Sequence, residues 1–584
     1  MADLPAASSS FCAVAPSPEL RQRMMEELDD VRSGPNELTT LLGFTSTPTR
    51  LGFDDGTIFP PGEFPAGTPL ATIAAAAADR APLRGAIRVV VVLVDFSDAP
   101  MTKSTADLDQ LFFSLGTMPH GSVREYFREV TNGMVDLVGE VHGPFRMPET
   151  MDWYAAGNFG IGRPSGPFRS PEMAMSAVEA ADPSVNFAPF DNDGNGYVDA
   201  FIVVHAGPAA DGTGKPFHIW SHKAHLPDVH QTDGVNVYGY LTISEEAKIG
   251  VCAHELGHLL FGFPDLYDTD DSSEGVGLWC LMGSGSWGGG GDRPTHPSAW
   301  CKVNQGWATT KVVTTSGDVS FTDVKSSQTV HRLWKDGEGG SEYFLLENRQ
   351  RTGYDSSLPG GGLLIWHIDE NQPNNRDENH YKVGLVQADN QRNLERNQNR
   401  GDDGDPYPGT SGNTSFTSSS APSSHSFGGA ASCISVTRIS PSAATMTATV
   451  AVSCGKDPAK EQKEFKELVE NKEAKERRDN DKTPRKEVKD DWDNPPDVIT
   501  APMGGEGTPT AADIVDLRTR LNALERALGA PGATGDPTEP FIGADLRPDL
   551  IGGPRFGRSI DALREAVEAG DAQAKRSFDT LPQQ

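Results

Sequence analysis

Runs of hydrophobic residues mark a central α/β region of the chain. Residues 87–96 (IRVVVVLVDF) contain a continuous apolar run from Val89 to Val94, and residues 200–205 (AFIVVH) are apolar up to Val204, which is typical of strands buried on both faces. Residues 235–243 (VNVYGYLTI) alternate instead, as a half-exposed or edge strand does. A helix is predicted at 122–131 and a further strand at 135–141. An α/β core therefore begins near residue 87.

The pattern changes on both sides of this core. Residues 309–455 contain short strands separated by Gly, Ser and Asn clusters, which predicts an all-β sandwich. Residues 1–86 are rich in Pro, Ala and Gly and are interpreted as an extended leader with one helix near 19–31. Residues 456–584 begin with a highly charged stretch and are predicted to be a loosely ordered tail with short helices.

Charge and length narrow the choice of function. The chain has 584 residues and a formal net charge of -31, which disfavours nucleic acid and anionic membrane surfaces as partners. No window approaches the roughly 20 apolar residues of a membrane span. The N-terminus shows no basic region followed by an apolar one, so no signal peptide is visible. Six cysteines without a CxxC pair argue against a cysteine zinc cluster, and Cys433 and Cys454 are candidates for a disulfide.

The most specific motif is His-Glu-Leu-Gly-His at residues 254–258. On a helix, His254 and His258 lie on one face and can bind one metal ion. Glu255 can then act as general base on a water held by the metal. Gly262 and the proline two residues later end the helix and turn the chain, so that Asp265 returns toward the metal as a third ligand.

The segment resembles the metzincin zinc signature and, more closely, the immune inhibitor A family of secreted zinc metalloendopeptidases. The sequence resembles that family over about residues 87–455, including segments 122–133, 190–208, 290–307 and 342–350. The resemblance implies a metzincin-like peptidase domain at 87–308, an aspartate as third zinc ligand, a propeptide in the leader and an extracellular location. Gly262 stands one residue later than in the usual pattern, so a bulge in the last helical turn is expected, and Asp265 is favoured over Asp268.

Two further residues are interpreted through this resemblance. Met282, in a Gly-rich turn after the helix, resembles the methionine that forms an apolar floor beneath the zinc in metzincins. Cys12 is a candidate thiolate ligand of a latent zymogen, but an unpaired or bridged cysteine is the favoured interpretation.

Two acidic loops are candidate calcium sites, because calcium prefers hard oxygen ligands. The first comprises Asp191, Asp193, Asn195, the carbonyl of Tyr197 and Asp199. The second and weaker candidate comprises Asp402, Asp403 and Asp405, for which a plain turn is an equal alternative.

The sequence thus predicts a zinc-dependent endopeptidase that hydrolyses peptide bonds in proteins or peptides through a zinc-bound water and Glu255, with Ca²⁺ as a second bound ion. Strand 235–243 is expected to pair with an extended substrate. One alternative is an inactive surface adhesion protein that uses the β-sandwich, and another is a calcium-stabilised scaffold. Within the peptidases, Glu274 is an alternative third ligand.

Overall fold

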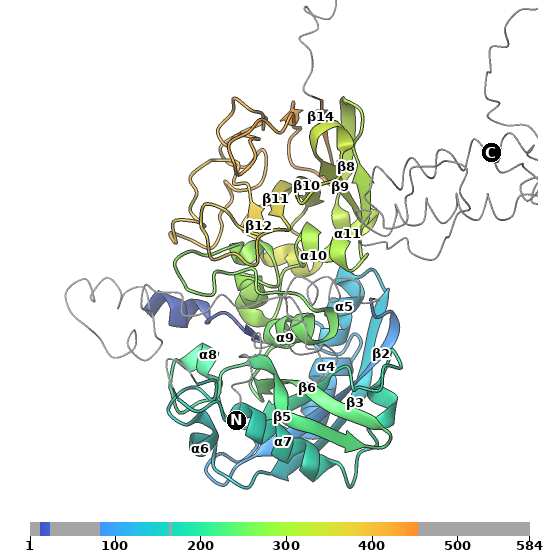
Figure 1. Ribbon diagram of the computed structural model, residues 1–584, viewed down its shortest axis with the longest axis vertical. Coiled ribbons are helices and arrows are strands. Elements are labelled where there is room, and N and C mark those ends of the chain that lie inside the picture. Colours follow the sequence, from blue (N-terminus) through green and yellow to red (C-terminus); the bar gives the residue numbers. More distant parts are fainter. Residues whose placement is uncertain (1–11, 24–81, 163–165, 454–584) are drawn as a thin grey trace, which may run out of the picture. The chain divides into compact units, whose positions relative to one another are not determined.

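The computed structural model describes residues 12–23, 82–162 and 166–453 (Figure 1). The strands are β1 (Cys12–Ala13), β2 (Gly85–Asp95), β3 (Val135–Arg146), β4 (Phe201–His205), β5 (His222–Thr232), β6 (Val235–Ser244), β7 (Thr309–Val312), β8 (Gly317–Thr322), β9 (Thr329–Leu333), β10 (Glu342–Arg349), β11 (Gly362–Asp369), β12 (Val383–Leu385), β13 (Ser435–Thr437) and β14 (Thr445–Ala451). The α-helices are α4 (Thr105–Phe113), α5 (Val123–Val130), α6 (Met151–Ala155), α7 (Ser170–Ala181), α8 (Ala210–Thr213), α9 (Ile249–Phe261), α10 (Ala299–Asn304) and α11 (Val324–Ser327). Short 3-10 helices are η1 (Ala188–Phe190), η2 (Gly277–Trp279), η3 (Ser284–Gly291), η4 (Lys335–Gly337) and η5 (Gly353–Ser357).

A six-stranded mixed sheet organises the first part of the chain. Its strand order is β1-β5-β6-β4-β2-β3, with parallel pairing from β6 to β3 and antiparallel pairing of β5 with both β6 and β1. Strand β2 lies in the interior, and its side chains alternate between two hydrophobic cores. Val89 and Val91 face one core while Val90 and Val92 face the other. Burial on both faces explains the continuous apolar run.

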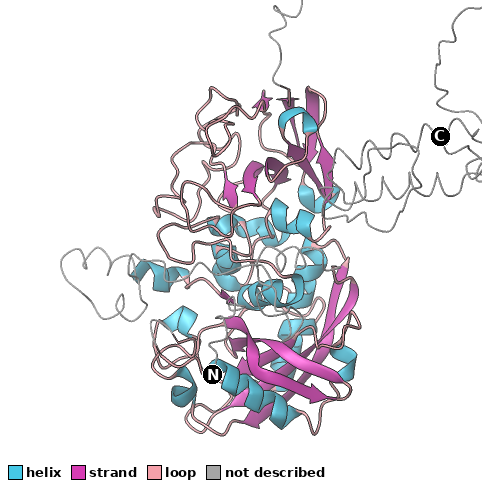
Figure 2. Ribbon diagram, in the orientation of Figure 1, coloured by secondary structure: helices cyan, strands magenta, loops and turns pink. Residues whose placement is uncertain are grey.

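Helices cover both faces of this sheet. Helices α4, α5 and α9 contribute to the core on one face, and α6 and α7 to the core on the other. Helix α5 begins where expected, because the Ser122 side chain accepts a hydrogen bond from the Glu125 amide and caps the first turn. Figure 2 shows several helices between the two groups of strands and others beside the lower group.

The strand predicted to bind substrate is not at the edge of the sheet. Strand β6 is paired on both sides, by β4 and β5, so the expectation for residues 235–243 is wrong. The edge position belongs to the short strand β1 from the leader, which pairs with β5. Sequence patterning missed β5 because its ladder is irregular between His225 and His230, around Pro227, and because charged residues interrupt its apolar positions.

The later strands form two further sheets. Strands β12-β11-β10-β9-β7 make one, and β13-β14-β8 make the other. A third core lies between them, with Phe321, Phe344 and Val450 among its members. The core around α9 also continues past residue 308 and includes Leu345 and Trp366, so apolar packing crosses the predicted domain boundary. The chain is thus a mixed α/β region with additional β-sheets.

Several expectations fall outside the described residues. Residues 18–23 are helical, whereas the rest of the helix expected at 19–31 is not described, and neither is the tail at 456–584. Within the described ranges, no helix combines the length and the apolar character that crossing a membrane would require.

Helix α9 is packed so closely that two of its glycines have no room for a side chain. A Cβ at Gly250 would collide with the carbonyl oxygen of Ser286 in η3, and one at Gly257 would lie 2.9 Å from the Met282 sulfur. All thirteen residues of α9 are buried. The helix is therefore held in a fixed position between the sheet and the turn that follows it.

This packing predicts that Gly250→Ala destabilises the protein. In an open helix the change gains about 1 kcal/mol from helix propensity, but here we expect a loss of about 1–3 kcal/mol because the methyl group pushes η3 away. Thermal unfolding measures the effect. The matched control is Gly212→Ala in α8, where a Cβ meets nothing within 4 Å. Equal stability changes in the two variants would contradict the packing argument.

Candidate metal centre

Helix α9 and the turn that follows it bring together three side chains of types that can bind a metal ion. The Nε2 atoms of His254 and His258 are 3.0 Å apart, and Oδ1 of Asp265 lies 3.2 Å from each of them. All three side chains are at most 2 % exposed. The four-residue spacing of the histidines gives the shared helix face, and the turn after α9 returns Asp265 to it.

The hydrogen bonds of the two rings leave this point without a proton. Nδ1 of His254 faces the Leu281 carbonyl at 3.0 Å, and Nδ1 of His258 faces the Phe263 carbonyl at 2.5 Å. A carbonyl only accepts, so each Nδ1 carries the proton of the neutral ring and each Nε2 presents a lone pair. Burial lowers the pKa of His258, although Asp265 opposes the shift, so the neutral ring is favoured.

Three lone pairs in contact repel one another unless a cation lies among them. Oδ1 of Asp265 has no hydrogen-bond partner among the described residues. Ligands about 2.0–2.1 Å from a tetrahedral zinc ion are about 3.3 Å apart, close to the separations seen here. Two imidazoles and a carboxylate, with both rings oriented by backbone carbonyls, are a donor set that zinc accepts. The residues present therefore fit the metal.

Glu255 lies beside this group without joining it. It is fully buried, and neither of its carboxylate oxygens has a hydrogen-bond partner among the described residues. Burial, and next the charges of Asp265 and Asp211, raise the pKa of Glu255 well above its usual range, while Lys223 opposes the rise. A nearby divalent cation would also act against the rise. A carboxylate whose two oxygens have no hydrogen-bond partner among the described residues is suited to accept a proton from water.

Met282 lies directly beneath the helix that carries the histidines. Its sulfur is the nearest atom to the position of a Cβ at Gly257, and its carbonyl accepts from the amides of Leu266 and Tyr267. The residue before it orients His254 through the carbonyl described above. The turn at 277–283 thus supports both the helix and the return of the chain.

The alternative third ligands point elsewhere. Asp268 accepts hydrogen bonds from the hydroxyls of Ser272 and Ser273. Glu274 forms ion pairs with Arg21 and Arg400. Neither carboxylate belongs to the group around His258.

The extra residue before Gly262 does not form a bulge, so that expectation is wrong. Helix α9 remains α-helical to Phe261, and Gly262 then adopts the left-handed conformation with φ of 64°. Its amide returns to the carbonyls of Gly257 and His258 and closes the helix. The additional residue lengthens the helix end, and the turn after it still brings Asp265 back.

The leader contributes a residue to this site, which the sequence alone did not favour. Cys12 lies with His258 and Asp265 in a group whose ligand atoms are all within 4.8 Å of one another. Residues 12–17 are buried. Three side-chain donors hold their backbone: Tyr267 Oη binds the Ala13 carbonyl, Trp220 Nε1 that of Val14, and Trp287 Nε1 that of Ala15. These donors come from distant segments, and no spacing in the sequence identifies them.

The two acidic loops differ in how well the structure assembles them. Asp191, Asp193 and Asp199 bring their carboxylates within 4.8 Å of one another, whereas the Asn195 amide oxygen accepts the Tyr197 amide proton. No such group includes the Tyr197 carbonyl.

In the second loop the grouped residues are Asp389, Asp402 and Asp405, and Asp403 is not among them. The Asp403 carboxylate accepts from the Thr410 hydroxyl instead. Asp405 is 1 % exposed and its Oδ1 has no hydrogen-bond partner among the described residues. Burial, and also its neighbours Asp402 and Asp389, raise the pKa of Asp405 to about 7. Asp389 could not be foreseen, because it lies on a separate segment.

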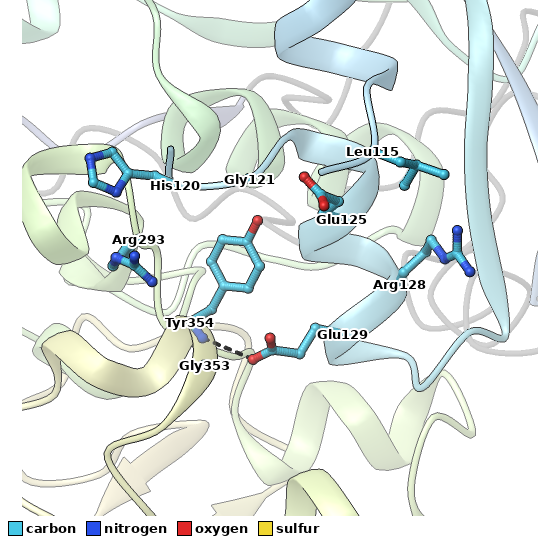
Figure 3. Close-up of a pocket in the computed structure, with 9 residues that line it drawn as sticks. All are labelled: Leu115, His120, Gly121, Glu125, Arg128, Glu129, Arg293, Gly353 and Tyr354. Carbon is cyan, nitrogen blue, oxygen red and sulfur yellow. Dashed lines mark hydrogen bonds between the residues drawn. The ribbon is translucent and has the colours of Figure 1, made fainter. Parts of the chain in front are cut away.

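A separate surface pocket of about 460 Å³ lies beside α5 (Figure 3). Glu125, Glu129, Arg293 and Tyr354 are among its lining residues, and none of the lining residues belongs to the metal group. Glu129 is already engaged, because it accepts the Tyr354 amide proton at 2.8 Å and lies 3.0 Å from Nε2 of His296. The pocket therefore offers no chemistry comparable to that of the metal group.

The region that contains the metal group is similar to known proteins. Residues 86–314 match the model of the immune inhibitor A peptidase M6 catalytic domain. Two curated relatives are the pre-pro-metalloprotease PrtV of Vibrio cholerae serotype O1, from strain M66-2 and from strain ATCC 39315 / El Tor Inaba N16961. Each is 30% identical over 270 residues, covering 37% of this chain and 29% of the relative. The match thus spans less than a third of the relatives' length.

The geometry predicts which aspartate binds the metal. Asp265→Asn removes the carboxylate that faces both rings, so we expect zinc affinity to fall by more than the roughly 10–100-fold typical of an outer-shell change. Asp268→Asn is the matched control and should keep its zinc. Competition with a chromogenic chelator measures both affinities. A larger loss in the Asp268 variant would overturn the assignment.

Proposed function

Since residues 86–314 of this chain belong to the immune inhibitor A peptidase M6 family, we propose that the protein is a zinc-dependent endopeptidase that hydrolyses peptide bonds in proteins. We assign His254, His258 and Asp265 as zinc ligands and Glu255 as the general base. Met282 is the supporting residue beneath the site.

One observation carries this proposal. Two ring nitrogens and one carboxylate oxygen converge at 3.0–3.2 Å with both ring protons directed away from the point of convergence. Such an arrangement is stable only around a cation. A purely structural helix has no need to bury three unshielded lone pairs.

The proposed mechanism divides the work between the ion and the chain. When bound, zinc polarises the scissile carbonyl and makes a water molecule more acidic. Glu255, which is fully buried beside the metal group, takes a proton from the attacking water and gives it to the leaving amine. His254 and His258 keep their orientation because their Nδ1 protons stay on backbone carbonyls. The apolar surroundings exclude other water.

We also propose the wider organisation of the protein. The leader at 1–86 is a propeptide, the catalytic domain covers 87–308 with a metzincin-like fold, a β-sandwich covers 309–455 and a tail covers 456–584. The core shared by the sheets of β10 and β14 supports the sandwich. An extracellular location is supported by the disulfide bond of Cys433, because disulfides persist in oxidising compartments, and by the pre-pro form of the relatives.

Calcium is proposed as a second, structural ion. The better supported site is Asp389 with Asp402 and Asp405, because the buried Oδ1 of Asp405 has no other described partner. The loop with Asp191, Asp193 and Asp199 is a second site of the same kind. An adhesion protein or a calcium scaffold would account for these sites, but neither would account for a buried Glu255 beside the metal group.

The general-base role predicts a separation of activity from metal binding. We expect Glu255→Gln to lower hydrolysis of a protein substrate by at least about 10²–10⁴-fold, because the side chain no longer accepts a proton. Zinc content and unfolding temperature should stay near wild type, since Glu255 is not a ligand. Removing zinc with a chelator should abolish activity, and restoring zinc should recover it. Full activity in the glutamine variant would refute the mechanism.

The calcium proposal predicts a cation-dependent stability. Calcium at about 100 times its Kd should stabilise the fold by about 2.7 kcal/mol per site, because it binds only the folded state. We expect Asp405→Asn to remove part of this gain and Asp403→Asn, a neighbouring acid outside the group, to keep it. Differential scanning calorimetry with and without calcium measures the shift. An unchanged unfolding temperature in wild type would count against both sites.

A further inference from the structure

We propose that Cys280 and Cys301 are the two halves of a reversible disulfide, which joins the turn beneath the metal group to helix α10. Both cysteines are free thiols in the structure. Cys280 directly follows η2 in the turn at 277–283, and Cys301 lies within α10. The inference goes beyond the proposed function, because it concerns a covalent modification outside the metal group and holds whether or not the chain hydrolyses peptides.

Ser298 brings the two sulfur atoms together. Its amide donates to Sγ of Cys280 at 3.1 Å, and its hydroxyl donates to Sγ of Cys301 at 3.4 Å. The two thiols also share a hydrogen bond with each other. Both cysteines are 0 % exposed. Thiols that already contact each other can be joined with little movement, whereas cysteines held far apart cannot be bridged unless the backbone moves.

The surroundings of the pair make Cys280 the nucleophile. Its sulfur accepts from the amides of Met282 and Ser298, in addition to the Cys301 thiol. Burial alone would raise the pKa of Cys280, but these hydrogen bonds outweigh it and lower the pKa below its usual value. Burial raises the pKa of Cys301 instead, and its hydrogen bond to Cys280 raises that pKa further. The shared proton therefore stays on Cys301, and Cys280 has the thiolate character that disulfide exchange requires.

Cys252, inside α9, is a buried thiol without such surroundings. It is 0 % exposed, like the pair. Burial, and to a smaller extent the charge of Glu255, raise the pKa of Cys252 far above its usual range, and no second thiol among the described residues takes part. Burial by itself therefore makes a cysteine inert, and what distinguishes Cys280 is its partner.

The chain carries a disulfide elsewhere, because Cys433 is disulfide-bonded. Disulfides persist where the surroundings oxidise thiols. A chain that keeps the Cys433 bond therefore meets conditions under which a contacting pair of thiols also oxidises.

The exchange balances with a low-molecular-weight disulfide as the oxidant. The Cys280 thiolate attacks one sulfur of that disulfide, its S–S bond breaks, and one small thiol leaves with a proton from solvent. The Cys301 thiol then loses its proton and attacks the mixed disulfide at Cys280, which releases the second small thiol. The protein pair gives up two electrons and two protons, and the oxidant takes up both. Because neither cysteine is exposed, exchange occurs before the turn packs on α10 or while it opens locally.

The disulfide links the support of the metal group to the later strands. The turn that carries the first cysteine orients a proposed metal ligand, because the Leu281 carbonyl faces Nδ1 of His254. The helix that carries the second cysteine is fixed to strand β10 through the buried ion pair of Lys302 with Glu347 at 3.3 Å. The bond closes a loop of about 20 residues, which restricts the unfolded chain more than the folded one.

Redox titration followed by mass spectrometry tests the assignment. The full-length protein is refolded in mixtures of reduced and oxidised glutathione, exchange is stopped with acid, and free thiols are alkylated before digestion. We expect a peptide pair joined through Cys280 and Cys301 in the oxidising mixtures and two alkylated thiols in the reducing ones. The Cys433 bond is the internal control for oxidation, and Cys252 should be alkylated throughout.

Three results would refute the disulfide. In the first, both thiols of the pair remain alkylated in every mixture that oxidises Cys433. In the second, either thiol ends as a mixed disulfide with glutathione. In the third, Cys252 is linked to one member of the pair.

Matched variants separate the bond from the packing around it. We expect the unfolding temperature to rise between the reducing and the oxidising mixture by roughly 5–10 °C more in wild type than in Cys301→Ser, because the variant keeps only the Cys433 bond. Cys252→Ser, which removes a buried thiol outside the pair, should keep the full rise. An equal rise in wild type and Cys301→Ser would contradict the assignment, and if that variant does not fold, the peptide map of wild type decides.

These measurements do not depend on hydrolysis. A protein that forms the linked peptide but cleaves no substrate supports the disulfide and refutes the peptidase function. A protein that cleaves substrate but never forms the linked peptide refutes the disulfide and leaves the peptidase function in place.

Discussion

The convergence of two histidine nitrogens on α9 with the Asp265 carboxylate is the constraint on which the site depends. Both histidine rings give their Nδ1 protons to backbone carbonyls, one from Leu281 and one from Phe263. Those carbonyls belong to the segments after the helix, so the turn around Met282 and the return at Gly262 must both be in place. The close approach at Gly250 and Gly257 is part of the same requirement. The arrangement of the proposed metal ligands therefore depends on the packing around α9.

The six-stranded sheet supplies the frame for this constraint. Because β2 and β4 are buried on both faces, helices are needed on each side, and α9 is one of those that cover the face carrying the site. Strand β5 follows β6 in the sheet and has one further edge, and a strand edge is a template for another extended segment. In this chain the leader occupies that edge through β1.

Buried charged groups differ in whether the described residues supply them with partners. Arg349 is fully buried and binds the carboxylate of Asp355. Burial alone would raise the pKa of Asp355, but the Arg349 charge outweighs it and holds that pKa far below its usual range. In that pair each charged group has the other as a partner of opposite charge. Glu255, Lys223 and Asp405 differ, because each has buried polar atoms without a described partner. Unsatisfied groups of this kind are rare in folded proteins, and they mark the positions at which a ligand or an ion is expected.

The sequence by itself determined the local features. The apolar run at 87–96, the capped helix after Ser122, the two histidines on one face of α9 and the end of that helix at Gly262 all follow from short-range patterns. Each depends only on residues a few positions apart, where helix and strand periodicity or a cap decides the outcome.

What only the tertiary structure decided are the contacts between distant segments. The pairing of β1 with β5, the exchange of Asp403 for Asp389 in the second acidic group and the approach of Cys12 to His258 depend on which segments meet. The three side chains that bind the leader backbone come from three separate segments. No pattern along the chain encodes such meetings, because they arise from the burial of whole faces and not from any one spacing.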